Sequence, residues 1–576
     1  MPNSTTSAFV VRGNNSNASF QLTIWRGEGM CLLAMNWKNG SPPDDFVGFA
    51  LEFREPDKDR FFSIKNRLSF PGSGSDGKSL STRLSPIQKF RWVHFPFNAE
   101  MDGEFTYRVT PVFMNSSDEL SYGEFQEAKV ALKRHTYEGQ LNVAFTRGFV
   151  SSQAFVDNFV SEGTSLTDLI PELARDGLDF TPSHPKTDVA LPWMGFEARR
   201  EILRLLDDAI ADESARVKVI AYDLNLPEMV DKLVELGDRV QVIIDDNSQD
   251  HGEEGSAENK AEMRLAVSAG AANVKRQHMG QLQHNKTIIV NSDTVKVAVG
   301  GSTNFSWRGF YIQANNALFV YGAQAIKPFE DAFDQYWLSD SVSEFGQHGA
   351  ATWTALGLAD VDAQVTFSPH SQNNAVLNWV ANDISNHVSS SLLFSIAFLY
   401  QTPGAIKNAV IKVTADSTKF VYGMSDKKVG GIEVLKPDGN LAPLSPSALE
   451  KNVPVPFKAE IAGGGGVRMH HKFVVIDFDK PTARVYLGSY NFSKAADNTN
   501  GENLFLIKDR RVAVAYMVEA IRLFDHYHFR ALQRDRTTRT NKLELKKPPR
   551  QPGELPWWSD DYTDPRRIKD RLLFSK

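Results

Sequence analysis

The pattern of apolar and polar residues changes near residue 140. Before that point, short segments alternate between apolar and polar positions and are separated by clusters of turn residues. Such segments lie at 20–24, 47–53 and 105–112, and almost no stretch has the period of an amphipathic helix. Short strands at this spacing are typical of two packed antiparallel sheets. We therefore expect residues 1–135 to form an all-β sandwich domain.

After residue 140 the pattern becomes one of strands that alternate with amphipathic helices. Strands are expected at 141–145, 217–222 and 240–245, and helices at 198–211, 227–236 and 257–269. This order is typical of an α/β fold with a largely parallel or mixed sheet.

The strand and helix order then recurs in the second part of the chain. The repeated elements are a strand at 365–369, which echoes 143–147, a helix at 374–384, a strand at 392–400, a helix at 405–413 and a strand at 420–423. A recurrence over about 180 residues indicates an internal duplication. We therefore expect two similar αβα lobes, over residues 136–350 and 351–530.

The segment 531–576 differs from the rest of the chain in its basic and aromatic composition. The residues concerned are Arg534, Arg536, Arg539, Lys542, Lys546, Lys547, Arg550, Trp557 and Trp558. A segment of this composition has little core of its own, so we expect a solvated extension that lies on the body of the protein. Contact of these side chains with phosphates or bases is the alternative.

A composite pattern of polar residues is repeated near the end of each lobe. The first copy comprises His284, Lys286, Asn291, Ser302, Asn304 and Asn315, and the second comprises His470, Lys472, Asp477, Ser489, Asn491 and Glu502. Each serine follows a glycine, and in both copies eleven positions separate the asparagine after Gly-Ser from the last residue. Chance rarely duplicates a composite pattern, so these residues are candidates for one functional site.

The spacing within each copy predicts which side chains share a face. Alternate residues of a strand project in the same direction, so we expect His284 beside Lys286 and His470 beside Lys472. The serine and asparagine after the glycine share a face by the same rule. The residue five positions after each lysine should face the other way. Each lobe then presents an imidazole, an ammonium and an amide to one small group.

Two such sets brought together suit the chemistry of a phosphodiester. Two lysines and two asparagines offer charge and hydrogen-bond donors to the oxygens of one phosphoryl group. Of two histidines on opposite sides, one attacks phosphorus while the other, protonated, donates to the leaving oxygen. Because the lysines supply the positive charge, we expect no metal and no cofactor.

The two copies resemble the signature of the phospholipase D superfamily, His-x-Lys-x4-Asp followed by Gly-Ser-x-Asn. The resemblance covers residues 140–530 and implies a two-lobed α/β sandwich with one shared active site and a covalent phosphohistidine intermediate. The catalytic residues that it implies are His284, Lys286, Asn304, His470, Lys472 and Asn491. The supporting residues are Asp477, Glu502, Asn291, Asn315, Ser302 and Ser489.

The first copy departs from the family pattern, because Asn291 stands where the family has Asp. We expect this change to weaken the orientation of the catalytic side chains in the first half-site without inactivating it. In the family, a Glu or Gln near Glu502 orients a catalytic histidine, whereas the first copy has the neutral Asn315. By analogy His284 is the nucleophile and His470 the general acid, although the residues alone leave this assignment open.

Three neighbouring features are expected to have no catalytic role. His471 alternates away from His470 and is expected to be structural. The glycines at 463–466 are not followed by the Lys-Ser/Thr of a phosphate loop, so we interpret them as a loop that borders the site, with lid motion as the alternative. The acidic residues at 245–254 are expected to form a solvated loop rather than a metal site.

Composition narrows the class of protein further. The chain has 576 residues, a formal net charge of −6 and a single cysteine, Cys31, so no intramolecular disulfide is possible. The sequence shows no secretory signal and no apolar run of about 20 residues, which favours a soluble, cytoplasmic protein; secretion by another route stays open. The lack of such runs argues against a membrane-embedded cardiolipin synthase.

These observations favour an enzyme of the phospholipase D type that cleaves or transfers a phospholipid or small phosphodiester, with possible peripheral membrane contact. The net negative charge argues against a general nuclease, but the basic tail and Asn291 keep a nuclease or DNA-processing phosphodiesterase as an alternative. A non-catalytic phosphate-binding protein on a degenerate scaffold is a further alternative. Since one chain supplies both half-sites, dimerisation is not required for catalysis.

Overall fold

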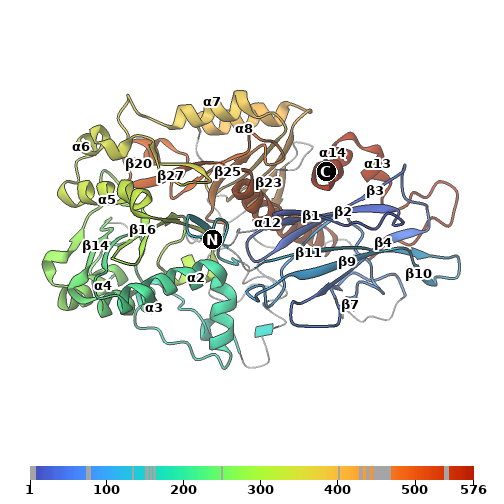
Figure 1. Cartoon of the computed structure of the whole chain (residues 1–576), viewed down its shortest axis with the longest axis horizontal. Coiled ribbons are helices and arrows are strands. Elements are labelled where there is room, and N and C mark those ends of the chain that lie inside the picture. The colour runs from blue at the N-terminus through green and yellow to red at the C-terminus, as the bar shows by residue number, and fades with distance from the viewer. Residues whose placement is uncertain are drawn as a thin grey trace. The chain divides into compact units, whose positions relative to one another are not determined.

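A computed structural model describes most of the chain (Figure 1). The described residues are 8–72, 79–132, 135–148, 155, 158–159, 164–247, 251–399, 403–426, 432–435, 441–444, 469–537 and 544–576. The chain divides into two compact units. Unit 1 comprises Met1–Arg134, Lys436–Asn440 and Val514–Lys576, and unit 2 comprises His135–Leu435 and Leu441–Ala513. The glycines at 463–466 lie outside the described residues.

Unit 1 is built on two antiparallel sheets. The first has the order β1 (Val10–Arg12), β2 (Phe20–Arg26), β3 (Cys31–Trp37) and β8 (Arg91–His94). The second has the order β10 (Leu120–Tyr122), β9 (Phe105–Met114), β4 (Phe46–Arg54) and β5 (Phe62–Ser63), with β11 (Gln126–Val130) also paired to β9. A separate ribbon joins β6 (Lys65–Asn66) to β7 (Leu80–Ser81).

One hydrophobic core is shared by the two larger sheets of unit 1. Alternate residues such as Phe20 and Leu22 of β2 and Phe105 and Tyr107 of β9 are buried in it. Apolar side chains at every second position therefore account for the pairing of two sheets face to face.

The C-terminal residues 544–576 contribute to the same core. They contain the helices α13 (Ser559–Thr563) and α14 (Pro565–Ser575). Trp558 and Phe574 are buried, and the indole of Trp557 donates a hydrogen bond to the carbonyl of Phe46 at 3.0 Å. This part of the predicted extension is therefore anchored on unit 1 by its aromatic residues, while many of its other residues are exposed.

Unit 2 contains two mixed sheets, so its fold is α/β. The first sheet has the order β12 (Leu141–Phe145), β18 (Asn316–Tyr321), β17 (Lys296–Gly301), β16 (Lys286–Asn291), β13 (Arg216–Ala221), β14 (Val240–Ile244) and β15 (Val274–Arg276). The second has the order β19 (Thr354–Ala355), β20 (Asp362–Ser368), β27 (Glu502–Lys508), β26 (Arg484–Gly488), β25 (Lys472–Ile476), β21 (Ser391–Ile396), β22 (Phe420–Asp426), β23 (Ile432–Leu435) and β24 (Leu441–Leu444).

Both sheets of unit 2 follow one pairing scheme. In each, a strand runs parallel to its neighbour on one side (β13 with β14, β21 with β22) and antiparallel to the lysine-bearing strand on the other (β16, β25). Residues that occupy equivalent places in the two sheets can therefore be compared directly. Ala221 pairs with Lys286 in the first, and Ile396 pairs with Lys472 in the second.

Helices pack against these sheets. The first core includes residues of α2 (Thr187–Ala211), α3 (Pro227–Glu235) and α4 (Ala257–Ser268), and the second includes residues of α7 (Leu377–His387) and α8 (Ala405–Ala415). The remaining helices are α5 (Ala323–Leu338), α6 (Val342–Gln347), α11 (Lys494–Asn498) and α12 (Arg510–Thr537), which carries the chain from unit 2 to unit 1. Among the described residues, no helix has both the length and the apolar character to cross a membrane.

Two predicted elements of unit 2 differ from the structure. The helix expected at 198–211 begins already at Thr187 and is interrupted at Phe196, whose φ of 50° is not helical. Pro192 and the interruption hide the helical period in this stretch of sequence. The strand expected at 392–400 ends at Ile396 because the apolar run continues into a turn.

Candidate active site

The two candidate histidines lie just before two equivalent strands of unit 2. β16 begins at Lys286 and β25 at Lys472, so each histidine lies two residues upstream of its strand. The predicted alternation along a regular strand therefore does not apply to them. Instead, the Nζ atom of Lys472 donates to the carbonyl of His470 at 2.8 Å, and Lys286 donates to the carbonyl of His284. Each lysine thus helps to hold the backbone of its own histidine.

Two isolated parallel bridges join the sheets beside the histidines. Gln283 pairs with Gly501, and Met469 pairs with Ala314. In each bridge, one residue directly precedes a histidine and the other directly precedes the last polar residue of the opposite copy. The bridges therefore bring each histidine next to a residue from the other copy of the pattern.

His284 is paired with a carboxylate. Its Nδ1 atom lies 2.7 Å from Oε2 of Glu502, and the same oxygen accepts a hydrogen bond from Oγ of Ser489 at 2.6 Å. Glu502 has no exposed surface. This burial raises the pKa of Glu502 to about 7. With Nδ1 occupied by the carboxylate, the Nε2 atom of His284 is the one left for chemistry.

His470 is paired with neutral oxygens. Its Nδ1 atom lies 2.9 Å from Oδ1 of Asn315 and 3.1 Å from the carbonyl oxygen of Ser302. Both are acceptors, so Nδ1 carries the proton in the neutral ring. The ring centroids of His470 and His284 lie 6.4 Å apart, and both side chains are buried. The two imidazoles therefore face one small space with unequal partners.

Burial and neighbouring cations favour neutral imidazoles. Burial, followed by the charges of Lys286 and Lys472, lowers the pKa of His284 well below its usual value. Burial and the same lysines also lower the pKa of His470. Burial lowers the pKa of Lys286 to about 8. A bound anion would reverse these shifts, because it would stabilise every cation around it.

The two predicted asparagines lie beyond the ends of strands. Asn304 follows β17 and Asn491 follows β26, so strand alternation does not set their direction either. Their buried side-chain oxygens have no hydrogen-bond partner among the described residues. A buried amide with an unused atom is costly unless a ligand completes its hydrogen bonds, which marks both positions as candidate binding groups.

The two serines differ in their contacts. The Oγ atom of Ser302 accepts hydrogen bonds from the backbone N–H of Asn316 at 3.0 Å. Ser489 makes the equivalent contact with the backbone N–H of Asn503 at 3.0 Å and also donates to Glu502. Ser302 therefore fixes a loop, whereas Ser489 also orients the carboxylate partner of His284.

Asn291 and Asp477 lie at the opposite ends of their strands from the histidines. The Asp477 carboxylate accepts backbone N–H hydrogen bonds from residues 389–391 at distances of 2.7 to 3.1 Å. The Asn291 amide donates to Oε1 of Glu330 at 2.8 Å. The exchange of Asp for Asn in the first copy therefore changes a supporting contact within the fold, not a group at the histidines.

Two further asparagines contribute in a way that spacing within one copy does not reveal. The Nδ2 atom of Asn503 donates to Oδ1 of Asn285 at 3.0 Å, and that of Asn316 lies 3.2 Å from Nδ1 of His471. Each contact joins the two copies. The available signal was the position of both asparagines directly after Glu502 and Asn315.

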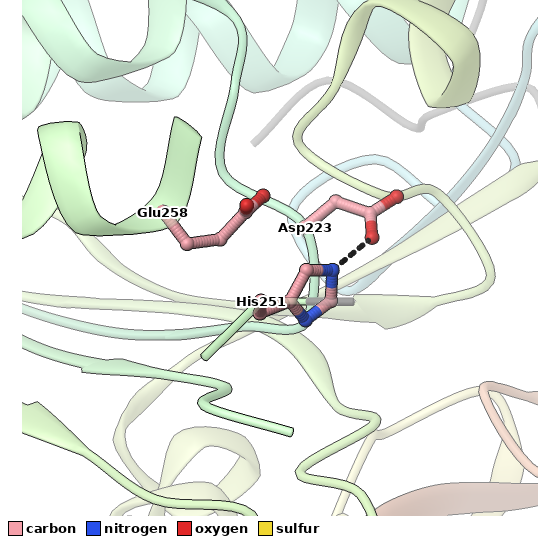
Figure 2. Close-up of side chains that lie close together, drawn as sticks. All are labelled: Asp223, His251 and Glu258. Carbon is pink, nitrogen blue, oxygen red and sulfur yellow. Dashed lines mark hydrogen bonds and ion pairs between the residues drawn. The ribbon is translucent and has the colours of Figure 1, made fainter. Parts of the chain in front are cut away.

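The acidic residues after β14 are solvated only in part, because Glu253 and Glu254 are exposed whereas Asp245 is buried. Asp245 and His251 are buried, and donor atoms of Asp223, His251 and Glu258 lie within 4.8 Å of one another (Figure 2). These three residues are the group among the described residues whose atoms could hold a metal ion. The carboxylates of Asp223 and Glu258 face His251, and the acidic composition of the loop does not indicate this arrangement.

Comparison with protein families matches part of the chain. A family model described as "Cardiolipin synthase, PLD-like domain" matches residues 204–337 and 437–524. Two curated proteins called phospholipase D, from Rickettsia felis and Rickettsia prowazekii, are each 44% identical over 48 residues. That match covers 8% of this chain and 22% of each relative.

Matches to solved structures have lower sequence identity. Phosphatidylserine synthase from Haemophilus influenzae Rd KW20 matches with a TM-score of 0.38 and 16% identity, over 66% of this chain and 93% of that one. Nuc from Salmonella typhimurium, a phospholipase D family member, matches with a TM-score of 0.19 and 24% identity, over 23% of this chain and 83% of that one.

Proposed function

Because the chain belongs to the phospholipase D superfamily, we propose that it is a phosphodiester-acting enzyme that works through a covalent phosphohistidine. Its substrate is a phospholipid or a small phosphodiester, and the acceptor of the phosphoryl group is water or an alcohol. The observation that carries this proposal is the unequal pair of buried histidines, one on Glu502 and the other on Asn315, with ring centroids 6.4 Å apart.

In the first proposed step, the Nε2 atom of His284 attacks phosphorus. A P–N bond forms, and the bond between phosphorus and the leaving oxygen breaks. His470, protonated at Nε2, gives this proton to the leaving oxygen, which departs as an alcohol. Glu502 accepts a hydrogen bond from Nδ1 of His284 and stabilises the positive charge that the ring gains.

In the second step, water or an alcohol attacks phosphorus and the P–N bond breaks. His470 takes the proton of the attacking group and returns to its protonated form, while His284 is regenerated as a neutral ring. His470 must be protonated at the start, although burial lowers its pKa in the free protein. The negative charge of the bound phosphodiester compensates, because it raises the pKa of the imidazole beside it.

Four side chains are proposed to hold the non-bridging oxygens of the phosphoryl group. Lys286 and Lys472 supply positive charge, and the Nδ2 groups of Asn304 and Asn491 supply hydrogen bonds. These groups stabilise the charge of the transition state, so we propose that the reaction needs no metal ion.

We propose the domain organisation that the sequence predicts. Residues 1–135 form an accessory β-sandwich, residues 136–350 and 351–530 form two duplicated lobes, and residues 531–576 form a basic and aromatic extension. The shared strand-pairing scheme of the two sheets in unit 2 supports the duplication. Both half-sites belong to one chain, so catalysis does not require a dimer. A phospholipid substrate would be met at a membrane surface or in a micelle.

Parallel substrates test the proposal. Wild type, His284→Ala and His470→Ala are assayed in EDTA with phosphatidylcholine micelles, bis-p-nitrophenyl phosphate and single-stranded DNA. We expect turnover of the lipid or the small ester that is lost in both variants. His278→Ala is the matched control, because His278 is exposed and its ring contacts Asp246, and neither residue belongs to a half-site. Turnover that needs added metal, or survives in both variants, would contradict the mechanism.

A further inference from the structure

His251 lies between two carboxylates next to the first half-site. Its Nδ1 atom lies 2.8 Å from Oδ2 of Asp245, and its Nε2 atom lies 3.2 Å from Oδ1 of Asp223. Figure 2 shows the contact with Asp223 and the carboxylate of Glu258 beside it. Because both ring nitrogens face carboxylate oxygens, both carry hydrogen and the ring is an imidazolium. Burial opposes this charge, but hydrogen bonds to Asp223 and Asp245 raise the pKa of His251 to about 10.

Asp245 connects this imidazolium to the backbone of the proposed nucleophile. Its Oδ1 atom accepts a hydrogen bond at 2.6 Å from the backbone N–H of Gln283, the residue before His284. Asp245 is fully buried and also accepts the backbone N–H of Asn247 at 3.0 Å. Its position therefore depends on His251 and fixes the segment that carries His284.

Tyr222 forms a second link between the two histidines. The centroid of its ring lies 4.6 Å from that of His251 and 4.7 Å from that of His284, with an edge contact in both cases. The Nζ atom of Lys286 lies 4.6 Å from the centroid of the same ring. Tyr222 is thus packed among His251, His284 and Lys286, and a change at His251 reaches the other two through it.

Asp223 forms a third link. It leads to the segment after β17 that contains Asn304, called the Asn304 loop below. Its Oδ2 atom accepts a hydrogen bond from Oγ of Ser306 at 3.2 Å, and Ser306 in turn accepts the backbone N–H of Gly309 at 3.1 Å. Ser306 lies two residues after Asn304. One imidazolium therefore holds, through two carboxylates, both segments that present the first set of candidate groups.

The second half-site has different residues at the equivalent positions. Ala221 pairs with Lys286 as Ile396 pairs with Lys472, so Tyr222 and Asp223 correspond to Ala397 and Phe398. Neither Ala397 nor Phe398 can donate or accept a side-chain hydrogen bond. The links that Tyr222 and Asp223 make are therefore absent at these two positions of the second half-site, whereas the half-site of His284, whose proposed role is to form and break a covalent bond, has both.

We propose that His251, held as an imidazolium by Asp223 and Asp245, is a positioning residue for the first half-site. It fixes the orientation of His284 and of the Asn304 loop without touching the substrate. This inference rests on the proposed function, since it assigns His251 a part in the same reaction. The other charged groups that face it are Glu258, from α4, and Arg276, which donates to the carbonyls of Asp245 and His251.

Kinetics of His251 variants test the effect on the reaction. His251→Gln removes the charge and leaves one donor group for two carboxylates. With bis-p-nitrophenyl phosphate we expect kcat to fall by about 10- to 100-fold, as is usual when a group that orients a reacting histidine is lost. We expect KM to change by less than about threefold, because no substrate contact is lost. His251→Lys restores a cation and should recover part of kcat.

His184→Gln is the matched control for the loss of a buried histidine. The ring nitrogens of His184 contact the carbonyl of Phe159 at 2.8 Å and the backbone N–H of Lys186 at 3.0 Å, and neither residue belongs to a half-site. We expect its kcat to stay near the wild-type value. An equal fall in kcat for His184→Gln and His251→Gln would show a general effect on the fold and overturn the assignment.

Nitrogen NMR of the histidine rings tests the positioning without any turnover. In the wild type we expect His251 to stay doubly protonated from pH 5 to pH 9, and His284 to carry its proton on Nδ1. In His251→Gln the His284 ring should populate both tautomers. A neutral His251 at pH 7, or an unchanged His284 spectrum in the variant, would overturn the proposal. If the wild type turns over no phosphodiester, the proposed function fails while this measurement still decides the role of His251.

A calorimetric titration with Mn²⁺ or Zn²⁺ tests whether this cluster binds a metal ion instead. An imidazolium cannot ligate a metal, so we expect no stoichiometric binding of either ion at pH 7. Binding of one ion per chain that is lost in His251→Gln would overturn the proposal, because Asp223, His251 and Glu258 would then be ligands.

Discussion

The Nδ1 atom of His284 lies 2.7 Å from Oε2 of Glu502, a residue 218 positions further along the chain. This contact pairs the histidine of one copy of the repeated pattern with the carboxylate of the other. Within the described part of the chain, the same atom of His470 has the neutral oxygens of Asn315 and Ser302 as its partners. The difference in partner, more than any difference between the histidines themselves, gives them separate roles in the proposed reaction.

Replacement of the carboxylate tests its role directly. We expect Glu502→Gln to lower kcat by about 10³-fold, because the amide cannot stabilise the charge that His284 gains and the wrong ring tautomer is favoured. Steady-state kinetics with bis-p-nitrophenyl phosphate measures the change. Asn315→Gln is the comparison on the other histidine and should cost much less. A fall of less than about threefold in Glu502→Gln would contradict the role given to the carboxylate.

Stability should depend on pH through the same residue. Burial raises the pKa of Glu502 from 4.5 to about 7, so the folded state keeps a proton that the unfolded state releases between these values. The stabilising effect of that proton is complete below pH 4.5 and is lost as pH rises through 7. The difference corresponds to about 3 kcal/mol of unfolding free energy.

Urea unfolding at pH 5 and pH 8 measures this contribution. We expect the wild type to lose more unfolding free energy over this interval than Glu502→Gln, because the glutamine does not titrate. Equal changes in the two proteins would show that the carboxyl is ionised at both pH values.

Substrates with different leaving groups distinguish the nucleophile from the general acid. His470→Ala should lose at least about 10²-fold in kcat with an alkyl ester, whose alkoxide must be protonated. With a p-nitrophenyl ester, His470→Ala should still release about one equivalent of p-nitrophenolate in a burst, because this leaving group departs without a proton, while steady turnover is lost with the base of the second step. His284→Ala should be inactive with both esters. The opposite pattern would exchange the roles of the two histidines.

We expect the amide of Asn291, which stands where the family signature has Asp, to be required by its contact with Glu330. It donates to Glu330 at 2.8 Å, so Asn291→Asp would set two carboxylates against each other. We expect a loss of about 1 kcal/mol in unfolding free energy and little change in kcat, because neither residue contacts the histidines. Urea denaturation of Asn291→Asp, Glu330→Gln and the double variant gives the coupling. Independent effects of the two changes would contradict the contact.

The sequence predicts the alternation of strands and helices well where one apolar face is sharply defined. The strand predicted at 217–222 matches β13, and the helix predicted at 227–236 matches α3. Prediction is poorer where an apolar run outlasts its strand, as after Ile396. In such a run, burial in a turn and burial in a strand produce the same composition.

The residues of the candidate site could be predicted from the sequence, but the contacts between them could not. The repeated pattern singles out His284 and His470, yet spacing within a copy says nothing about contacts between copies. The pairing of His284 with Glu502 arises from two bridges between residues more than 150 positions apart, which only the tertiary fold specifies. The support from His251 was missed for a similar reason, since Asp223 and Asp245 follow different strands.

The bridges of Gln283 with Gly501 and of Met469 with Ala314 have a consequence for how this chain can be divided. Each histidine has its hydrogen-bond partner in the opposite half of unit 2, so a fragment with one half alone holds an imidazole without an orienting group. Two separately made halves would be inert apart and competent only when reassembled. A change in one half of unit 2 would then be tolerated only where it preserves the contacts that the other half needs.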